Sequence, residues 1–113
     1  MAANAPPTNS NYSVKNIETV LTGTDVQARI FTLAPGEVIP WHSHSESTDY
    51  YFVLGGKLTI ERRTPDDRRA IAVGERYQIK AGNAHTLSNR EAEDCRFLLL
   101  QGTGRFDWIK SDG

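Results

Sequence analysis

Cysteine is nearly absent from this sequence, since Cys95 is the single cysteine among 113 residues. A lone cysteine excludes an internal disulfide framework and suits a reducing compartment. We therefore expect a cytoplasmic protein in which Cys95 is a small buried hydrophobic side chain rather than a reactive thiol.

An excess of charge of either sign is also missing. The 13 Lys and Arg residues and 14 Asp and Glu residues give a formal net charge of −1. No basic stripe is available for the phosphate contacts of nucleic-acid binding, and no apolar run approaches the length of a membrane span. The first residues have neither the basic start nor the apolar core of a signal peptide. We expect no nucleic-acid partner, no membrane association and no targeting signal.

Apolar side chains are scarce at the start of the chain. Residues 1–12 are mainly Pro, Asn, Ser and Ala, which have little to contribute to a core. This composition predicts a flexible N-terminal arm. The remainder, residues 13–113, is long enough for one hydrophobic core, so we expect one domain.

Long amphipathic helical periods are lacking as well, whereas short segments rich in β-branched and aromatic residues alternate with Gly, Pro, Asn and Asp turns. This pattern predicts an all-β sandwich or barrel. The expected strands cover residues 26–33, 38–44, 49–54, 57–63, 69–73, 76–80, 85–88 and 95–101. Residues 106–109 are expected to form a short strand or to cover a sheet edge.

Three histidines and one carboxylate fall into one spaced pattern. His42 and His44 are two residues apart, so their side chains project to the same face of a strand. Asp49 opens the next strand, and His85 follows the turn at Gly82. Imidazole and carboxylate ligands suit Fe, Mn, Ni, Co, Cu or Zn and are poorly suited to Ca or Mg. The sequence therefore predicts one divalent transition metal ion at His42, His44, Asp49 and His85, without choosing among these elements.

Two motifs in this region resemble those of the cupin superfamily, in particular its small single-domain members. The first motif, Gly-x5-His-x-His-x4-acid-x6-Gly, is met by Gly36, His42, His44, Asp49 and Gly56. The second, Gly-x5-Pro-x-Gly-x2-His-x3-Asn, is met by Gly74, Gly82, His85 and Asn89. The resemblance spans residues 36–89, and it implies a double-stranded β-helix, or jelly-roll barrel.

The sequence departs from the two motifs at Asp49, where the family usually has Glu, and at Lys80, where it usually has Pro. Asp49 is one methylene shorter than Glu. Either the backbone approaches the ion, or a water molecule intervenes, or the three histidines hold the ion alone. Glu46 is an alternative acidic ligand, although it lies in an expected loop.

Further pocket residues follow from strand alternation. Tyr51 shares a face with Asp49, so we expect Tyr51 and Asp49 to act in catalysis, with a packed Tyr51 at the rim as the alternative. On the strand over residues 95–101, Phe97 and Gln101 face the same way as Cys95. We take this face as inward and expect Tyr51, Phe97 and Gln101 to contact a substrate. Trp41 points away from the histidines and is expected to be a packing residue.

The opposite strand faces predict a homodimer. The resemblance to cupins implies pairing through exposed sheets, and these faces are too apolar for open water. The residues concerned are Tyr50, Phe52, Leu54, Leu98 and Leu100.

The resemblance implies a metal-dependent enzyme that acts on a small oxygen-rich or carboxylate molecule inside the barrel. Dioxygenase, isomerase, lyase and decarboxylase chemistry all occur on this fold, and the fold does not choose among them. Two alternatives stay open. One is a non-catalytic module that binds or senses a small molecule, and the other is a metal-free dehydratase or isomerase with a histidine base.

Overall fold

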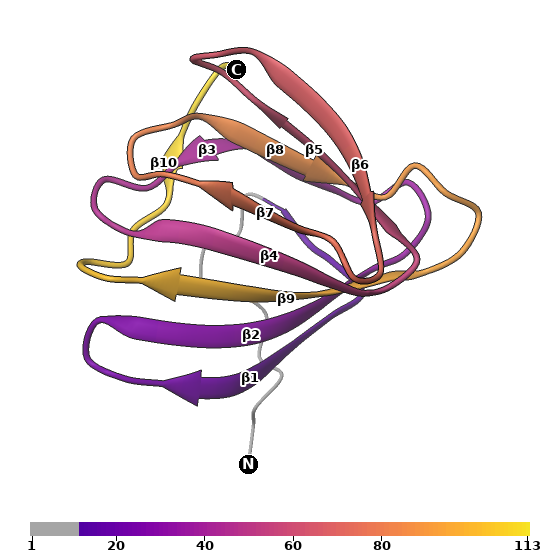
Figure 1. Cartoon of the computed structure of the whole chain (residues 1–113), viewed down its shortest axis with the longest axis horizontal. Helices are drawn as coiled ribbons and strands as arrows, with labels where there is room; N and C mark the ends of the chain where they lie inside the picture. Colours follow the sequence, from indigo (N-terminus) through magenta and orange to yellow (C-terminus); the bar gives the residue numbers. More distant parts are fainter. Residues whose placement is uncertain (1–11) are drawn as a thin grey trace.

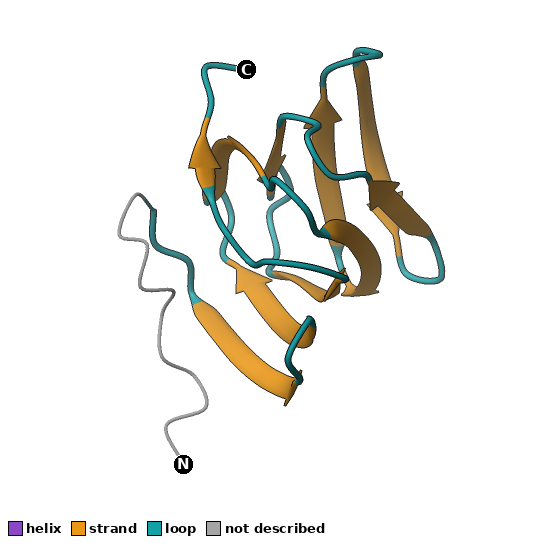
Figure 2. Ribbon diagram, turned by 90° about the vertical axis from the view of Figure 1, so that its left-hand side faces the viewer, coloured by secondary structure: helices purple, strands orange, loops and turns teal. Residues whose placement is uncertain are grey.

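Ten strands and no helix make up residues 12–113, the part of the chain that the structure, a computed structural model, describes (Figure 1, Figure 2). The strands are β1 (Asn16–Thr22), β2 (Val26–Leu33), β3 (Val38–Ser43), β4 (Thr48–Gly55), β5 (Lys57–Arg62), β6 (Asp67–Ala72), β7 (Arg76–Ile79), β8 (His85–Ser88), β9 (Cys95–Gly102) and β10 (Ile109–Lys110). Within residues 12–113, therefore, no helix is long and apolar enough to span a membrane.

The strands form two five-stranded antiparallel sheets. One sheet has the order β1-β2-β9-β4-β7 and the other β10-β3-β8-β5-β6. Successive strands such as β4 and β5 belong to different sheets, so the chain winds back and forth between the two layers (Figure 1). This arrangement confirms the all-β prediction and the double-stranded β-helix.

Gly56 allows the chain to cross between the sheets after β4. Its φ is +72°, and a Cβ atom there would lie 2.6 Å from the carbonyl oxygen of Asp94. Both the left-handed conformation and the close approach require a residue without a side chain. The final Gly of the first motif is thus explained by backbone geometry.

Strand alternation places the core and a polar cluster at opposite ends of the interior. On β9, the buried side chains run from Cys95 through Phe97 and Leu99 to Gln101. The β4–β9 register sets Asp49 opposite Gln101. The β2–β9 register sets Leu33 opposite Cys95 at the other end. The inner face is consequently apolar at one end and polar at the end where Asp49 lies.

The predicted strand boundaries agree with the structure within a few residues, and those of β2 and β8 coincide with it. Strand β1 was not predicted, since the first expected strand begins at Val26. Of its side chains only Ile17 is fully buried, and a β-bulge interrupts its register with β2 between Thr19 and Leu21. An edge strand with one buried residue and an interrupted alternation leaves a weak sequence signal.

Residues 1–11 of the predicted arm lie outside the described residues. Tyr12, the last residue of that predicted segment, is partly buried and packs against the hydrophobic core.

Candidate metal centre

The two sheets bring the four predicted ligands together. His42 lies on β3 and His44 just after it, while Asp49 lies on β4 and His85 on β8. All four side chains are buried, with Asp49 and His85 fully enclosed. One potential ligand atom from each residue lies within 4.8 Å of the others. The cluster is compact enough to hold a metal ion after small side-chain shifts.

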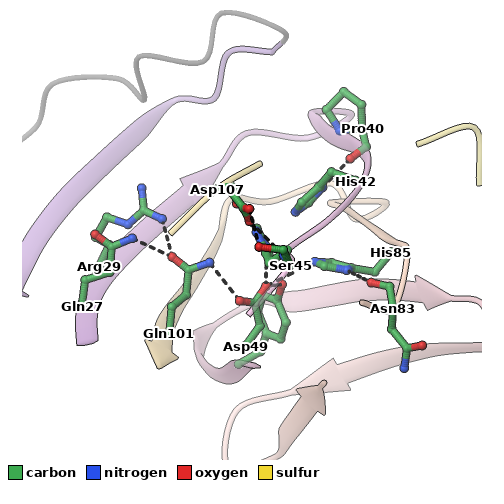
Figure 3. A network of polar contacts seen from close by, with 12 residues as sticks. Gln27, Arg29, Pro40, His42, Ser45, Asp49, Asn83, His85, Gln101 and Asp107 are labelled. Carbon is green, nitrogen blue, oxygen red and sulfur yellow. Dashed lines mark hydrogen bonds and ion pairs between the residues drawn. The ribbon is translucent and has the colours of Figure 1, made fainter. Parts of the chain in front are cut away.

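Backbone carbonyl groups fix the orientation of all three imidazole rings. Nδ1 of His42 lies 2.7 Å from the carbonyl oxygen of Pro40, and Nδ1 of His85 lies 2.8 Å from that of Asn83 (Figure 3). Nδ1 of His44 contacts the carbonyl oxygen of Asp107. A carbonyl oxygen can only accept, so each Nδ1 carries the proton that it donates. In the neutral rings Nε2 is then the unprotonated nitrogen, which is the form that binds metals.

The carboxylate of Asp49 faces two of these nitrogens. Its Oδ2 atom lies 3.2 Å from Nε2 of His44 and 3.2 Å from Nε2 of His85. Both nitrogens are buried, and within residues 12–113 neither has a hydrogen-bond partner of acceptable geometry. An unprotonated nitrogen and a carboxylate oxygen repel one another unless a cation or a proton lies between them. Ligands of one ion lie about 3.0–3.4 Å apart when the metal–ligand bonds are about 2.1 Å long. The donor set therefore fits a divalent transition metal.

Burial and mutual contacts set the charge states in this cluster. Burial, reinforced by His85, lowers the pKa of His42 to about 3, so this imidazole is neutral. Burial by itself would raise the pKa of Asp49, but contacts with His44 and His85 outweigh it and hold that pKa below its usual value. For His44, burial is outweighed by Asp49 and Asp107, and its pKa is raised. In the absence of a metal, protonation of His44, which its raised pKa favours, would relieve this repulsion, and a bound metal ion would take the place of that proton.

A second layer of hydrogen bonds holds the Asp49 carboxylate. The Tyr51 hydroxyl donates to Oδ2 at 2.6 Å, and the Gln101 amide donates to Oδ1 at 2.9 Å. Gln101 itself is fixed, because its Oε1 accepts from Nη2 of Arg29 at 2.9 Å and from Nε2 of Gln27 at 2.8 Å (Figure 3). These hydrogen bonds to the carboxylate oxygens favour the ionised form of Asp49 and fix the orientation of its side chain.

Sequence reasoning missed Gln27 and Arg29. Both lie on β2 and share its inner face with the buried Phe31 and Leu33. Strand alternation alone places an inward arginine there, so the signal was present in the sequence. It was not read, since a charged residue is ordinarily assigned to the outer face.

The C-terminal segment covers the histidine cluster. The Trp108 ring stacks on His42, with centroids 4.7 Å apart and an interplanar angle of 15°. Tyr12 lies beside Trp108 at 5.8 Å. The Asp107 carboxylate accepts hydrogen bonds from the backbone and hydroxyl of Ser45. The cavity lined by Trp108, Tyr12, His42 and His44 has a volume of about 20 Å³, roughly the space of one water molecule. The predicted covering segment thus closes the site itself rather than a sheet edge alone.

The remaining candidate residues take different places. Tyr51 lines the cavity wall and is fully buried, and burial, followed by Asp49, raises its pKa well above the usual value. Phe97 stacks on Phe31 in the core, with centroids 5.2 Å apart, and is not among the cavity-lining side chains of residues 12–113. The structure therefore places Tyr51, but not Phe97, where a small molecule could reach it.

The alternative ligand Glu46 and the expected packing residues Trp41 and Cys95 all lie outside the histidine cluster. Glu46 is exposed and its carboxylate accepts from Arg105, away from the cluster. Trp41 carries the Arg63 guanidinium over its ring at 4.7 Å, as expected of a packing residue. Cys95 is fully buried, and burial raises the pKa of its thiol to about 11. A thiol of that kind is unreactive at neutral pH.

Comparison with known proteins places this geometry in a family. The profile of the cupin domain matches residues 29–101, about two thirds of the chain. No curated protein matches the sequence.

Among solved structures, a conserved protein with a double-stranded β-helix domain from Klebsiella pneumoniae superposes with a TM-score of 0.76 at 20% identity, covering 95% of this chain and 90% of that one. KdgF from Halomonas sp. has a TM-score of 0.71 at 19% identity, covering 80% and 79%. Oxalate oxidase in complex with glycolate has a TM-score of 0.69 at 20% identity, covering 76% of this chain but 46% of its own. At these identities the likeness extends to the fold, and the profile match decides the family. The chain belongs to the cupin domain family.

Proposed function

We propose that this protein is a metal-dependent enzyme that acts on a small oxygen-rich carboxylate. The observation that carries the proposal is the shared orientation of the three histidines. Each Nδ1 is hydrogen-bonded to a backbone carbonyl, which leaves Nε2 of each ring free to bind a metal, and Nε2 of His44 and of His85 lies 3.2 Å from the Asp49 carboxylate. His42, His44, His85 and Asp49 would hold one divalent transition metal ion.

When bound there, such an ion supplies a Lewis acid or an oxygen-binding centre. The protein's own groups prepare the site for it. Asp49 contributes a negative charge that His44 and His85 keep ionised. Tyr51 stays protonated across the neutral range and donates its hydroxyl proton to Asp49. Trp108 and Tyr12 limit the water around the ligands, which strengthens every electrostatic interaction inside.

The choice of a small carboxylate has two supports. The cavity of about 20 Å³ excludes a bulky molecule unless the cover moves a long way. Oxalate oxidase, which shares the fold with this chain, binds glycolate, a carboxylate with a second oxygen donor. Both supports favour a short-chain acid that can present two oxygens to one ion.

A specific observation favours a second candidate, a non-catalytic module that binds or senses a small molecule. The Tyr51 hydroxyl is hydrogen-bonded to the Asp49 carboxylate, so neither group is free to act as an acid or base in the cavity. General acid–base catalysis requires such a group within reach of the substrate. Saturable binding of short carboxylates by metal-loaded protein without turnover would favour this candidate.

Metal analysis of protein purified without an immobilised-metal column tests the proposal. We expect close to one transition metal ion per chain after growth with Fe, Mn, Ni and Zn supplied. Turnover of a panel of short 2-hydroxy and 2-oxo acids by the loaded protein, and none by the metal-free protein, would support the enzyme. A metal content near zero would overturn both the enzyme and the metal-dependent binding module.

We also propose a homodimer through the outer face of the β1-β2-β9-β4-β7 sheet. The strand registers place one residue from each of the five strands in a single row across this face. In strand order the row is Glu18, Ile30, Leu98, Phe52 and Arg76. A two-fold axis parallel to the strands would set each Glu18 over the partner's Arg76. Such a row is apolar at its centre and complementary in charge at its ends.

Light scattering at micromolar concentration tests the dimer. We expect twice the chain mass for the parent and the chain mass for Leu98→Lys. Val73→Lys, at a site on the protein surface that is 62% exposed, is the control and should stay dimeric. A parent of monomer mass would refute the pairing.

A further inference from the structure

Arg29 is a cation directed into the interior beside the candidate metal centre. It lies on the inner face of β2, and its side chain lines the same cavity as His42 and His44. The guanidinium carbon lies 5.1 Å from the centre of the Phe31 ring, and Nη2 donates to Gln101 Oε1. Figure 3 shows the guanidinium above Gln101, on the side away from Asp49. The head group is thus held in one place by stacking and by one hydrogen bond.

The hydrogen-bonding capacity of Arg29 is not used up. Its Nε atom is buried and has no partner among the residues that the structure describes. Within residues 12–113, Arg29 also forms no ion pair with a carboxylate, since Gln101 stands between it and Asp49. A guanidinium has five donors and stays protonated even when burial lowers its pKa, as it does here.

Such a position is unfavourable for the protein on its own. Arg29 is partly buried, and a partly desolvated charge without a contacting counter-ion costs free energy that neutral hydrogen bonds recover only in part. The guanidinium fork matches the two oxygens of a carboxylate. An anion in the cavity would therefore offset the desolvation free energy of Arg29 and accept hydrogen bonds from its unused N–H groups.

We propose that Arg29 binds the carboxylate of the small molecule that this site takes and so determines its specificity for short acids. This inference rests on the proposed function and names the residue that selects the substrate class. Besides Arg29, His42, His44 and the polar side chains of Tyr51 and Gln101, the lining of this cavity includes the apolar side chains of Phe31, Ile39, Leu87 and Leu99.

The charges of the site define the ligand further. A divalent ion, the Asp49 carboxylate and the Arg29 guanidinium together leave two net positive charges in a poorly solvated space. A ligand with two anionic or strongly polar oxygens, one for each positive centre, matches them best. Short 2-hydroxy acids, 2-oxo acids and dicarboxylates have this form, whereas simple amines and neutral sugars do not.

Entry of such a ligand requires the cover to give way. The cavity of about 20 Å³ is smaller than a carboxylate group with its neighbouring carbon. Of the residues that line the cavity, Tyr12 and Trp108 are partly exposed, whereas Phe31 and Gln101 are buried. Outward movement of Tyr12 or Trp108 therefore requires less free energy than movement of the buried residues and would admit the acid.

The test uses glycolate and acetate as probes, at ionic strength matched with potassium chloride. Isothermal calorimetry on metal-loaded protein should show glycolate binding to the parent and at least about tenfold weaker binding to Arg29→Gln. The control is Arg96→Gln, which removes the same charge from an exposed position on β9 and should bind glycolate like the parent. Parental glycolate affinity in Arg29→Gln would overturn the proposal.

Two further measurements separate this inference from the proposed function. Metal titration should give nearly the same affinity for the parent and Arg29→Gln, because Arg29 contacts none of the four ligands and Gln27 still holds Gln101, which donates to Asp49. In metal-free protein, acetate should raise the melting temperature of the parent but not that of Arg29→Gln. A protein that binds no metal but keeps this acetate effect would lose the proposed function and retain the Arg29 site. If Arg29→Gln does not fold, Arg29→Met replaces it in each of the three measurements, with the same expected outcomes. The apolar chain of methionine can pack on Phe31.

Discussion

The Tyr51 hydroxyl donates a 2.6 Å hydrogen bond to Oδ2 of Asp49, the same oxygen that lies 3.2 Å from Nε2 of His44 and of His85. Tyr51 and Asp49 are two residues apart on β4, so one short strand supplies both a carboxylate and the donor that orients it. This pairing makes Tyr51 a positioning residue in the present arrangement, acting on the metal site through Asp49.

Tyr51→Phe should therefore weaken metal binding without abolishing it. The four candidate ligands remain, but Asp49 loses the donor that orients it, and loss of such a partner typically costs about 10–100-fold in affinity. Competition titration against a chromophoric chelator measures the change. Tyr77→Phe is a matched control, because Tyr77 also donates at 2.6 Å to a carboxylate, that of Asp67 outside the cluster. Equal affinities in the two variants would contradict the role given to Tyr51.

The histidine ligands can be tested one at a time. His42→Ala, His44→Ala and His85→Ala should each lose most of the bound metal, because a shell that lacks one of four ligands is incomplete. Metal content after dialysis measures the loss. Ser43→Ala is the control, since Ser43 lies between His42 and His44 and strand alternation turns it to the other face. Full metal content in His85→Ala would mean that the second motif serves the fold only.

The sequence carried the main features of this site because strand alternation and motif spacing are local properties. The inward faces of β4 and β9 follow from period two alone, and both are observed with Asp49, Tyr51 and Gln101 buried. The cross-strand partners of these residues could not be predicted, because they depend on the register between strands, which the whole sheet determines. The contact between Arg29 and Gln101 could not be read from a spacing of 72 residues.

The cover over the histidines was only partly predictable. The short strand or edge cover expected over residues 106–109 overlaps the two-residue strand β10 only at Ile109. That Trp108 would stack on His42 depends on the loop between β9 and β10, whose path no periodicity specifies. The inward direction of Phe97 on β9 is confirmed, and its contact with a substrate stays a prediction. Phe97 packs in the core and is not among the cavity-lining side chains of residues 12–113, because alternation gives direction and not distance from the cavity.

Removal of the cover should speed exchange at the metal site. Trp108→Ala deletes the ring that stacks on His42, so a chelator should strip the metal faster than from the parent. Stopped-flow mixing with EDTA gives the rate. Trp41→Ala is the control, because that indole packs against Arg63 outside the cluster. Identical rates in the two variants would show that Trp108 does not limit access.

The metal-free protein should become less stable as the pH falls. The pKa of His42 is about 3 in the fold against an ordinary value of 6.5. Between these values the unfolded chain binds a proton that the folded chain does not, so acid favours unfolding by at most about 1.4 kcal/mol per pH unit for this group. Asp49, whose pKa is also lowered, adds to the loss at more acidic pH.

The raised pKa of His44 acts in the opposite sense. Its contribution is present at pH values below 6.5 and is lost as the pH rises through the higher folded value. Urea denaturation with EDTA present, carried out on the parent and on His42→Asn, separates the two effects, because the variant keeps His44. A flatter pH dependence is expected for His42→Asn. Superimposable curves would show that His42 is not held neutral by burial.

Asp49 is where the chain departs from the usual glutamate, and its variants decide how many ligands the ion has. Asp49 is fully buried, with its carboxylate already against His44 and His85. If this carboxylate binds the ion, Asp49→Ala should weaken metal binding strongly. Asp49→Glu should be tolerated, because the longer acid is the family's usual ligand.

Asp49→Asn separates charge from shape in the same site. The amide has nearly the same volume and keeps one oxygen, but it removes the negative charge that offsets part of the ion's charge. We expect affinity for Co²⁺ to fall at least about tenfold, with a changed visible spectrum because the ligand field differs. Glycolate should then bind the cobalt form of Asp49→Asn more tightly than the parent form, since more positive charge is left on the ion. Parental cobalt affinity and spectrum in both Asp49→Ala and Asp49→Asn would mean that three histidines hold the ion alone and that the hydrogen bonds from Tyr51 and Gln101 stabilise only the fold.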